Sequence, residues 1–199
     1  MSKIFLETIR AVDGEIFNIS YHQQRYENVL NSFGIEGARS LKNLLNPPKT
    51  GTYRCRLTYD VSREPHTINI SYHRYKKRDI KSLKLIYDND IDYSLKSICR
   101  DELDVLYSLR GECDDILIIR DSLVTDTSIA NIAFFDSQRW ITPASPLLKG
   151  TARARLLDEG VIFESDIYVD ELKNFSKVAL LNAMIDFDII TQSTKEIFC

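Results

Sequence analysis

Two basic residues, Lys96 and Arg100, stand four positions apart in the segment 93–100. If this segment is helical, their side chains lie one turn apart on one face of the helix. Neighbouring cations lower each other's proton affinity, and a neutral lysine amine is a nucleophile. The spacing makes Lys96 a candidate catalytic lysine, although an exposed basic edge of a helix would produce the same spacing.

Two further segments carry groups that could bind an anion. Arg25 lies near the start of a helical pattern, and its guanidinium could bind a phosphate through two hydrogen bonds. Gly150, Thr151 and Ala152 stand at the predicted start of another helix, where backbone N–H groups and the helix dipole favour a phosphate. Each segment also has a purely structural explanation: an exposed helix arginine in the first case, and a Thr151 helix cap in the second.

One carboxylate, Asp126, lies just before the apolar strand pattern 132–135. A buried carboxylate is costly unless a partner compensates its charge. Taken alone, Asp126 is better explained as a residue of the turn that closes a hairpin.

The composition indicates a globular protein with a small-molecule partner. Its 199 residues, 44% apolar and 28% charged, fit one large domain or two small ones. A net charge of -3 gives no basic excess for nucleic acid, and no segment has the length of a membrane span or the apolar core of a signal peptide. The cysteines match no zinc pattern, so we expect no metal site and reduced thiols in a cytoplasmic protein: Cys55, Cys99, Cys113 and Cys199.

The elements that must position the candidate residues follow from periodicity and turn chemistry. Asp13-Gly14 predicts a tight hairpin turn. The pattern predicts helices over residues 21–33, 38–45, 94–109 and 151–159. It predicts strands over 4–11, 14–19, 52–60, 67–72, 83–87, 115–120, 131–135, 140–142, 177–181 and 187–191. This mixture indicates an α+β or α/β protein with an N-terminal domain over 1–88 and a C-terminal domain over 89–199.

The order of the candidate residues along the chain is more informative about function than each residue alone. The series runs through Phe5-Leu6-Glu7-Thr8-Ile9-Arg10, His22-x-x-Arg25, Lys96, Asp126 to Asn131, Thr142-Pro143, Gly150 to Arg153, and Asn182-Ala183-Met184. It resembles the class IV aminotransferase family, which includes branched-chain aminotransferases, D-amino-acid aminotransferases and aminodeoxychorismate lyases. The resemblance covers residues 5–184 and is greatest for short, lyase-like members.

The resemblance implies an enzyme that uses pyridoxal 5′-phosphate (PLP). It implies an α+β fold of the two-domain, D-amino-acid aminotransferase-like kind, PLP fold type IV. Lys96 stands where the family's lysine holds the cofactor and moves a substrate proton. Arg25 matches the phosphate-binding arginine, the amides of Thr151 and Ala152 match the helix-start cradle, and Asp126 matches the carboxylate that keeps the pyridine nitrogen protonated. A homodimer with its active site between the two domains is also implied.

The chain departs from the family pattern at three positions. The carboxylate beside the pyridine nitrogen is usually Glu, and Asp126 is one methylene shorter, so the ring or its loop must shift slightly. The family's Ile-Thr-Arg after the glycine is Thr151-Ala152-Arg153 here, and Cys99 replaces an Asn that often follows the lysine by three residues. These departures bear on the substrate more than on PLP binding.

The resemblance favours one reaction among several. We expect a lyase that converts 4-amino-4-deoxychorismate to 4-aminobenzoate and pyruvate, a step toward folate. The alternatives are a class IV aminotransferase acting on branched-chain or D-amino acids, and a non-catalytic scaffold that keeps the PLP fold. The candidates for binding a substrate carboxylate are Arg54 and Arg56, which share one strand face, and Arg10, His73 and Arg74. An exposed polar sheet face would explain each of them equally well.

Overall fold

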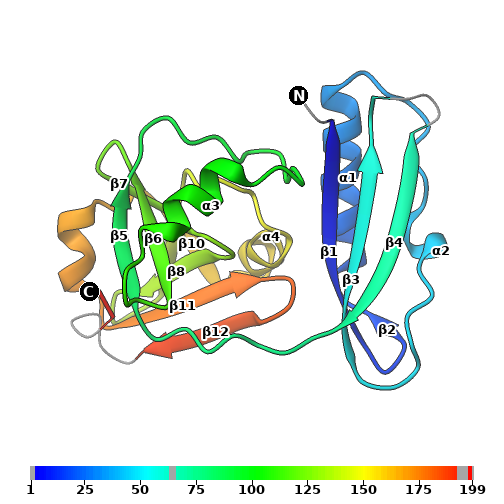
Figure 1. Cartoon of the computed structure of the whole chain (residues 1–199). Coiled ribbons are helices and arrows are strands. Elements are labelled where there is room, and N and C mark those ends of the chain that lie inside the picture. The colour runs from blue at the N-terminus through cyan, green and yellow to red at the C-terminus, as the bar shows by residue number, and fades with distance from the viewer. Residues whose placement is uncertain (1–2, 63–65, 192–196, 199) are drawn as a thin grey trace. The chain divides into compact units, whose positions relative to one another are not determined.

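The computed structural model describes residues 3–62, 66–191 and 197–198 (Figure 1). The chain divides into two compact units. The first comprises Met1–Lys77 and Leu95–Cys99, and the second comprises Arg78–Ser94 and Arg100–Cys199.

Unit 1 is an antiparallel sheet in the order β2-β1-β3-β4, with α1 along one face (Figure 1). Its elements are β1 (Ile4–Val12), β2 (Glu15–Ile16), α1 (Ile19–Ser32), α2 (Leu41–Leu44), β3 (Thr52–Asp60) and β4 (Thr67–Arg74). Asp13 and Gly14 have φ angles of 49° and 87°, which confirms the predicted hairpin turn. The inward side chains of β1 and β3 meet α1 in one core made of Phe5, Tyr26, Val29, Leu30, Ile35, Leu41, Leu57, Tyr59 and Val61.

The segment around Lys96 is not helical but contains bends and an isolated bridge from Ser97 to Phe5, so the predicted helix over 94–109 is wrong in its first part. The helix α3 is confined to Asp101–Ser108. The Leu6 N–H donates to the Lys96 carbonyl (2.9 Å), and the Ile98 N–H donates to the Ile4 carbonyl (3.1 Å). Because β2 pairs only with the far end of β1, the edge at Ile4 and Leu6 is open to this segment. These backbone bonds replace the helical ones, and Lys96 and Arg100 do not share a helix face.

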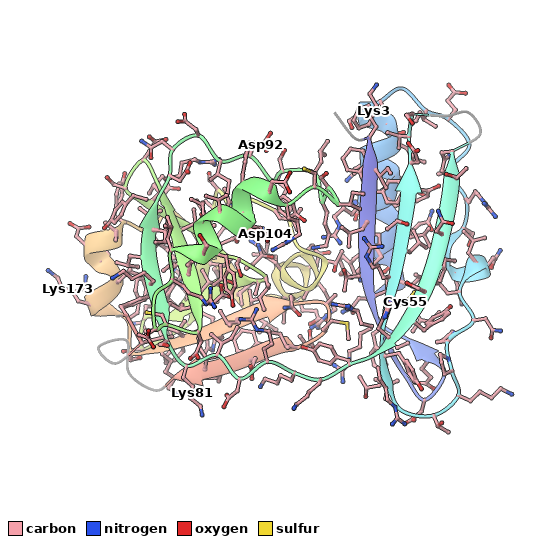
Figure 2. The ribbon with its side chains drawn as sticks, viewed as in Figure 1. Lys3, Cys55, Lys81, Asp92, Asp104 and Lys173 are labelled. Atoms are coloured by element: carbon pink, nitrogen blue, oxygen red, sulfur yellow. The ribbon has the colours of Figure 1, made fainter. Side chains whose placement is uncertain are left out.

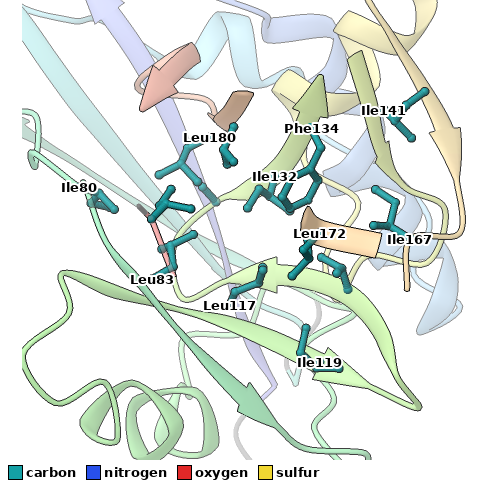
Figure 3. Packing of buried hydrophobic residues seen from close by; sticks show 14 residues of the cluster. Ile80, Leu83, Leu117, Ile119, Ile132, Phe134, Ile141, Ile167, Leu172 and Leu180 are labelled. Atoms are coloured by element: carbon teal, nitrogen blue, oxygen red, sulfur yellow. The ribbon is translucent and has the colours of Figure 1, made fainter. Parts of the chain in front are cut away.

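Unit 2 is built on a mixed sheet in the order β10-β9-β8-β7-β6-β5, to which β11 and β12 are added at β8. The pairs β5/β6 and β9/β10 are parallel, and the others are antiparallel. The strands are β5 (Leu83–Tyr87), β6 (Asp115–Arg120), β7 (Leu123–Thr127), β8 (Asn131–Phe135), β9 (Trp140–Pro143), β10 (Ile162–Ser165), β11 (Lys177–Asn182) and β12 (Asp186–Thr191). Besides α3, the helices are α4 (Thr151–Asp158) and the 3-10 helix η1 (Val169–Asn174). Figure 3 shows the largest core of this unit, where Leu117, Ile132, Phe134 and Leu180 pack together.

The division into units differs from the predicted boundary near residue 88 at two places. The strand β5 pairs with β6 and therefore belongs to unit 2, although it precedes that boundary. Lys96, which the sequence places in the second domain, belongs to unit 1 through its backbone pairing with β1. Local patterns did not show either association, since each joins segments far apart in the chain.

Several local predictions are corrected by the structure. The strands β7 and β10 and the helix η1 were not predicted, and the second predicted helix shortens to α2. Cys55 and Cys99 are reduced thiols, as expected, whereas Cys113 is disulfide-bonded, so the expectation is wrong there. Cys199 lies outside the described residues. Within the described part of the chain, no helix combines the length and apolar character that crossing a membrane requires.

Candidate active site

A single carboxylate occupies the buried face of β1 in unit 1. Glu7 lies between Phe5 and Ile9 in the inward phase of the strand and is 0% exposed. It accepts hydrogen bonds from Arg25 Nε (2.8 Å) and Nη2 (2.6 Å), and from His22 Nδ1 (2.5 Å). Both donors come from α1, where a spacing of three residues places them on one face. We call these three residues the Glu7 cluster.

The charges of the Glu7 cluster follow from its contacts. Burial alone would raise the pKa of Glu7, but the Arg25 charge and the His22 hydrogen bond outweigh it and lower that pKa to about 2. Burial lowers the pKa of His22, so its imidazole is neutral and donates through Nδ1 to the ionised carboxylate. The Lys96 charge also lowers the pKa of His22, which places the lysine in the same electrostatic environment.

Unit 1 therefore brings together two of the predicted site residues. Arg25 is held by Glu7, and Lys96 is half-buried and bonded through its backbone to β1, the strand that carries Glu7. The sequence did not identify Glu7 and His22 as part of the site. A signal existed, because Glu7 is a carboxylate in the apolar phase of a strand, and such a residue needs cationic partners elsewhere in the chain.

The predicted carboxylate-binding candidates lie partly together on this sheet. The strand register places Arg10 opposite Arg54 and Arg54 opposite His73. Arg56 projects from the same sheet face, opposite α1, whereas the register of Arg74 places it on the other face. Among the described residues, Arg54 and Arg56 form no ion pair or side-chain hydrogen bond, and the buried Nε of Arg10 has no hydrogen-bond partner. The face is thus rich in uncompensated positive charge.

In unit 2, Asp126 lies in the strand β7 and not in a turn. It is 4% exposed, and its register partner is Asn131 of β8. Asp126 Oδ1 accepts from Asn131 Nδ2 (2.7 Å), and Oδ2 accepts from the Leu148 N–H (2.9 Å). Burial raises the pKa of Asp126 to about 6, although these hydrogen bonds and the Arg153 charge act in the opposite direction. Both hydrogen-bond donors are neutral.

The start of α4 lies next to the amide that holds Asp126. Asn131 Nδ2 also donates to the Leu148 carbonyl (2.7 Å), and a Cβ at Gly150 would lie 2.0 Å from Asn131 Oδ1. Glycine is therefore required here for space, since its φ of -70° is open to any residue. The Ala154 N–H makes the first intrahelical bond, to Gly150, so the amides of the preceding helix residues, Thr151 and Ala152 among them, point out of the positive end of the helix.

Arg100 serves unit 2 rather than the lysine. Its Nη2 donates to the Ser128 carbonyl (2.9 Å), and its guanidinium lies 5.4 Å from the centre of the Tyr93 ring. Its Nε is 3.5 Å from Oδ1 of Asp104, which lies on α3 (Figure 2). These contacts brace the loop that follows Asp126. They leave no structural basis for a Lys–Arg pair on one helix face.

The two units thus carry candidate binding groups of different kinds. Unit 1 supplies a lysine amine and an arginine fork held by a buried carboxylate. Unit 2 supplies a helix start and a buried carboxylate whose direct donors, among the described residues, are all neutral. Taken separately, the groups of unit 1 suit an aldehyde and a phosphate, and those of unit 2 suit a phosphate and a ring nitrogen able to carry a proton.

Comparison with known proteins gives consistent matches. Residues 5–192 match the family described as amino-transferase class IV. An uncharacterized protein of Haemophilus influenzae is 36% identical over 184 residues, which cover 89% of this chain and 96% of that protein. A crystal structure of a proposed 4-amino-4-deoxychorismate lyase from Haemophilus somnus has a TM-score of 0.82 and 35% identity, and the match covers 92% of this chain and 97% of that one. A Schizosaccharomyces pombe protein, named as a proposed aminodeoxychorismate lyase, is 28% identical over 92% of this chain and 86% of its own length.

Proposed function

Since the chain belongs to the class IV aminotransferase family of PLP-dependent enzymes, we propose that it binds PLP through Lys96 and cleaves 4-amino-4-deoxychorismate. Membership of this family and the α+β, two-domain fold of PLP fold type IV are confirmed. The observation that carries the cofactor assignment is the state of Asp126. A buried carboxylate with a raised pKa and only neutral donors in direct contact gains most from a cation placed beside it.

The residues of each unit have distinct roles in this proposal. Arg25 and the amides of Thr151 and Ala152 would hold the phosphate, and Asp126 would keep the ring nitrogen protonated. When bound, PLP supplies an electron sink for the electrons released beside the amino group. Lys96 would hold the cofactor and then accept the proton from the carbon that bears the substrate amino group.

The lyase reaction is favoured by the names of two proteins that are similar to this chain over most of their length. The Haemophilus somnus and Schizosaccharomyces pombe proteins both carry lyase names, and the chain spans most of each. In this reaction Lys96 would accept the proton from the ring carbon that bears the amino group, and the bond between the neighbouring ring carbon and the enolpyruvyl oxygen would break. Enolpyruvate leaves and takes up a proton to become pyruvate, and the ring becomes aromatic. No oxidant and no amino acceptor is consumed. The arginines on the sheet face opposite α1, Arg10, Arg54 and Arg56, would suit the two substrate carboxylates.

The proposal is tested first by absorbance and then by product. Purified protein incubated with PLP should acquire a visible band, and Lys96→Ala should abolish it while the exposed Lys84→Ala on β5 retains it. Supplied with 4-amino-4-deoxychorismate and no amino acceptor, the wild type should release pyruvate.

Two outcomes would contradict the proposal in different ways. A protein that stays colourless with PLP would remove the cofactor assignment and the reaction together. A protein that binds PLP, releases no pyruvate and transfers the amino group of D-alanine or a branched-chain amino acid to a 2-oxo acid would replace the lyase with an aminotransferase.

A further inference from the structure

The guanidinium of Arg25 is fixed at two points by Glu7. The Nε and Nη2 groups form one edge of the planar fork, and both donate to the two oxygens of one carboxylate. Two parallel bonds of this kind fix the plane and the direction of the guanidinium, which one bond to a point charge cannot do. The carboxylate is itself held by His22 and is 0% exposed, so it has little freedom to move.

The strand that carries Glu7 also holds the lysine. The Leu6 N–H, in the peptide next to Glu7, donates to the Lys96 carbonyl at 2.9 Å. PLP is a rigid ring that bears its aldehyde and its phosphate arm on neighbouring carbons. A lysine and an arginine that bind these two groups must therefore keep a fixed separation. Within unit 1, Glu7 is the side chain that ties Arg25 to the strand on which Lys96 rests.

We propose that Glu7 is a positioning residue that holds Arg25 in the orientation that binds the cofactor phosphate. The proposal rests on the proposed function and names a role for a residue that does not itself touch the cofactor. Two simpler roles predict different results. If Glu7 were only a counter-charge, its loss would leave Arg25 more positive and would tighten phosphate binding. If it were only a structural brace, its loss would weaken every ligand alike.

The test compares PLP with pyridoxal, which has the same ring and aldehyde but no phosphate. Apo-protein is titrated with each compound, and the dissociation constants are read from the visible absorbance. Glu7→Gln should weaken PLP binding by roughly tenfold or more, since a freed arginine must be ordered again on binding. Pyridoxal binding should change by less than about twofold. The control is Glu27→Gln, which removes the same charge from α1, where the carboxylate accepts from Gln23 and does not contact Arg25.

A double-mutant cycle shows whether Glu7 acts through the arginine. In an Arg25→Ala background, Glu7→Gln should add no further loss of PLP affinity. If Glu7→Gln does not fold, Glu7→Asp keeps the charge and withdraws it by one methylene, and it should give a smaller loss that is still selective for PLP.

Three outcomes overturn the proposal, and they are distinct from failure of the proposed function. Unchanged or tighter PLP binding by Glu7→Gln would make Glu7 a counter-charge. Equal losses for PLP and pyridoxal would make it a structural brace, and an additive loss in the Arg25→Ala background would show that it acts elsewhere. A wild-type protein that binds no PLP would overturn the proposed function and this inference together.

Discussion

Each unit buries a carboxylate of the candidate site, and the surroundings of these two carboxylates shift their pKa values in opposite directions. Glu7 is 0% exposed and has a pKa of about 2, whereas Asp126 is 4% exposed and has a pKa of about 6. The two side chains are buried to nearly the same extent, so burial does not decide the direction of the pKa shift. The direct partners decide it, because Glu7 contacts the Arg25 guanidinium and Asp126 contacts neutral amides. Glu7 is compensated by a cation within its own unit, whereas the direct hydrogen-bond donors to Asp126 are neutral.

The largest effect is expected from removing the charge of Glu7. Glu7→Gln leaves the partly buried Arg25 beside a neutral amide, so the free energy of unfolding at pH 7 should fall by about 3–5 kcal/mol. The folded pKa of about 2 lies below the ordinary 4.5, so this stabilisation is present above pH 4.5 and disappears as the pH falls toward 2. Urea unfolding at pH 7 and pH 3 should therefore show a smaller difference between the variants at pH 3.

The matched control separates this effect from a general loss of charge. Glu27→Gln removes a half-buried carboxylate from α1 and should change the unfolding free energy by less than about 0.5 kcal/mol. A Glu7→Gln variant as stable as the wild type at pH 7 would contradict the contrast between the two carboxylates.

Asp126 should show the opposite dependence on pH. Its folded pKa of about 6 lies above the ordinary 3.8, so the folded apo-protein retains a proton that the unfolded chain has lost. Ionisation of Asp126 therefore lowers the free energy of unfolding. This destabilisation is absent below pH 3.8 and reaches its full size above pH 6. Asp126→Asn removes the ionisable group. The unfolding free energy of the variant relative to the wild type should therefore rise by about 3 kcal/mol between pH 4 and pH 8. Parallel pH profiles for the two proteins would show that Asp126 does not titrate in this range.

The sequence predicts those parts of the fold whose signals are local. The strands β3, β5, β6 and β8 have the predicted ends, because their alternating or continuous apolar runs are bounded by turn residues. The strand β7 was missed because Thr125, Asp126 and Thr127 interrupt the apolar pattern, although all three are buried. Their polar groups are satisfied across the sheet, for example from Thr125 Oγ1 to the Ile118 carbonyl (2.8 Å), and no local pattern reveals such a partner.

The same limit applies to the candidate site. Lys96 and Asp126 were identified from their order along the chain, which a family resemblance preserves. The spacing argument for Lys96 and Arg100 assumed a helix and is wrong, because pairing with β1 outweighs the helical pattern. The Glu7 cluster was missed because Glu7 is 15 residues from His22 and 18 residues from Arg25 in the sequence, and only folding brings the carboxylate to these donors.

The smallest effect on stability is expected at two glycines, one in each unit. They compare steric crowding in one unit with backbone strain in the other. Gly150 in unit 2 has φ of -70°, but an added Cβ would lie 2.0 Å from Asn131 Oδ1. Gly14 in unit 1 has φ of +87°, and the nearest atom to its added Cβ is 3.6 Å away. Gly150→Ala should therefore lower the unfolding free energy by about 1–2 kcal/mol through crowding. Gly14→Ala should lower it by about 1 kcal/mol through backbone strain.

A second substitution distinguishes these two causes. In an Asn131→Ala background the side chain that the methyl group would meet is gone, so Gly150→Ala should then cost less than about 0.5 kcal/mol. The cost of Gly14→Ala should be the same in either background, since no removal of a side chain relieves a positive φ. Chemical denaturation of the single and double variants measures both differences. If Gly150→Ala lowered the unfolding free energy equally with and without the Asn131 side chain, this amide would not be what limits the space beside the start of α4. Asp126 would then depend on Asn131 less than their hydrogen bonds indicate.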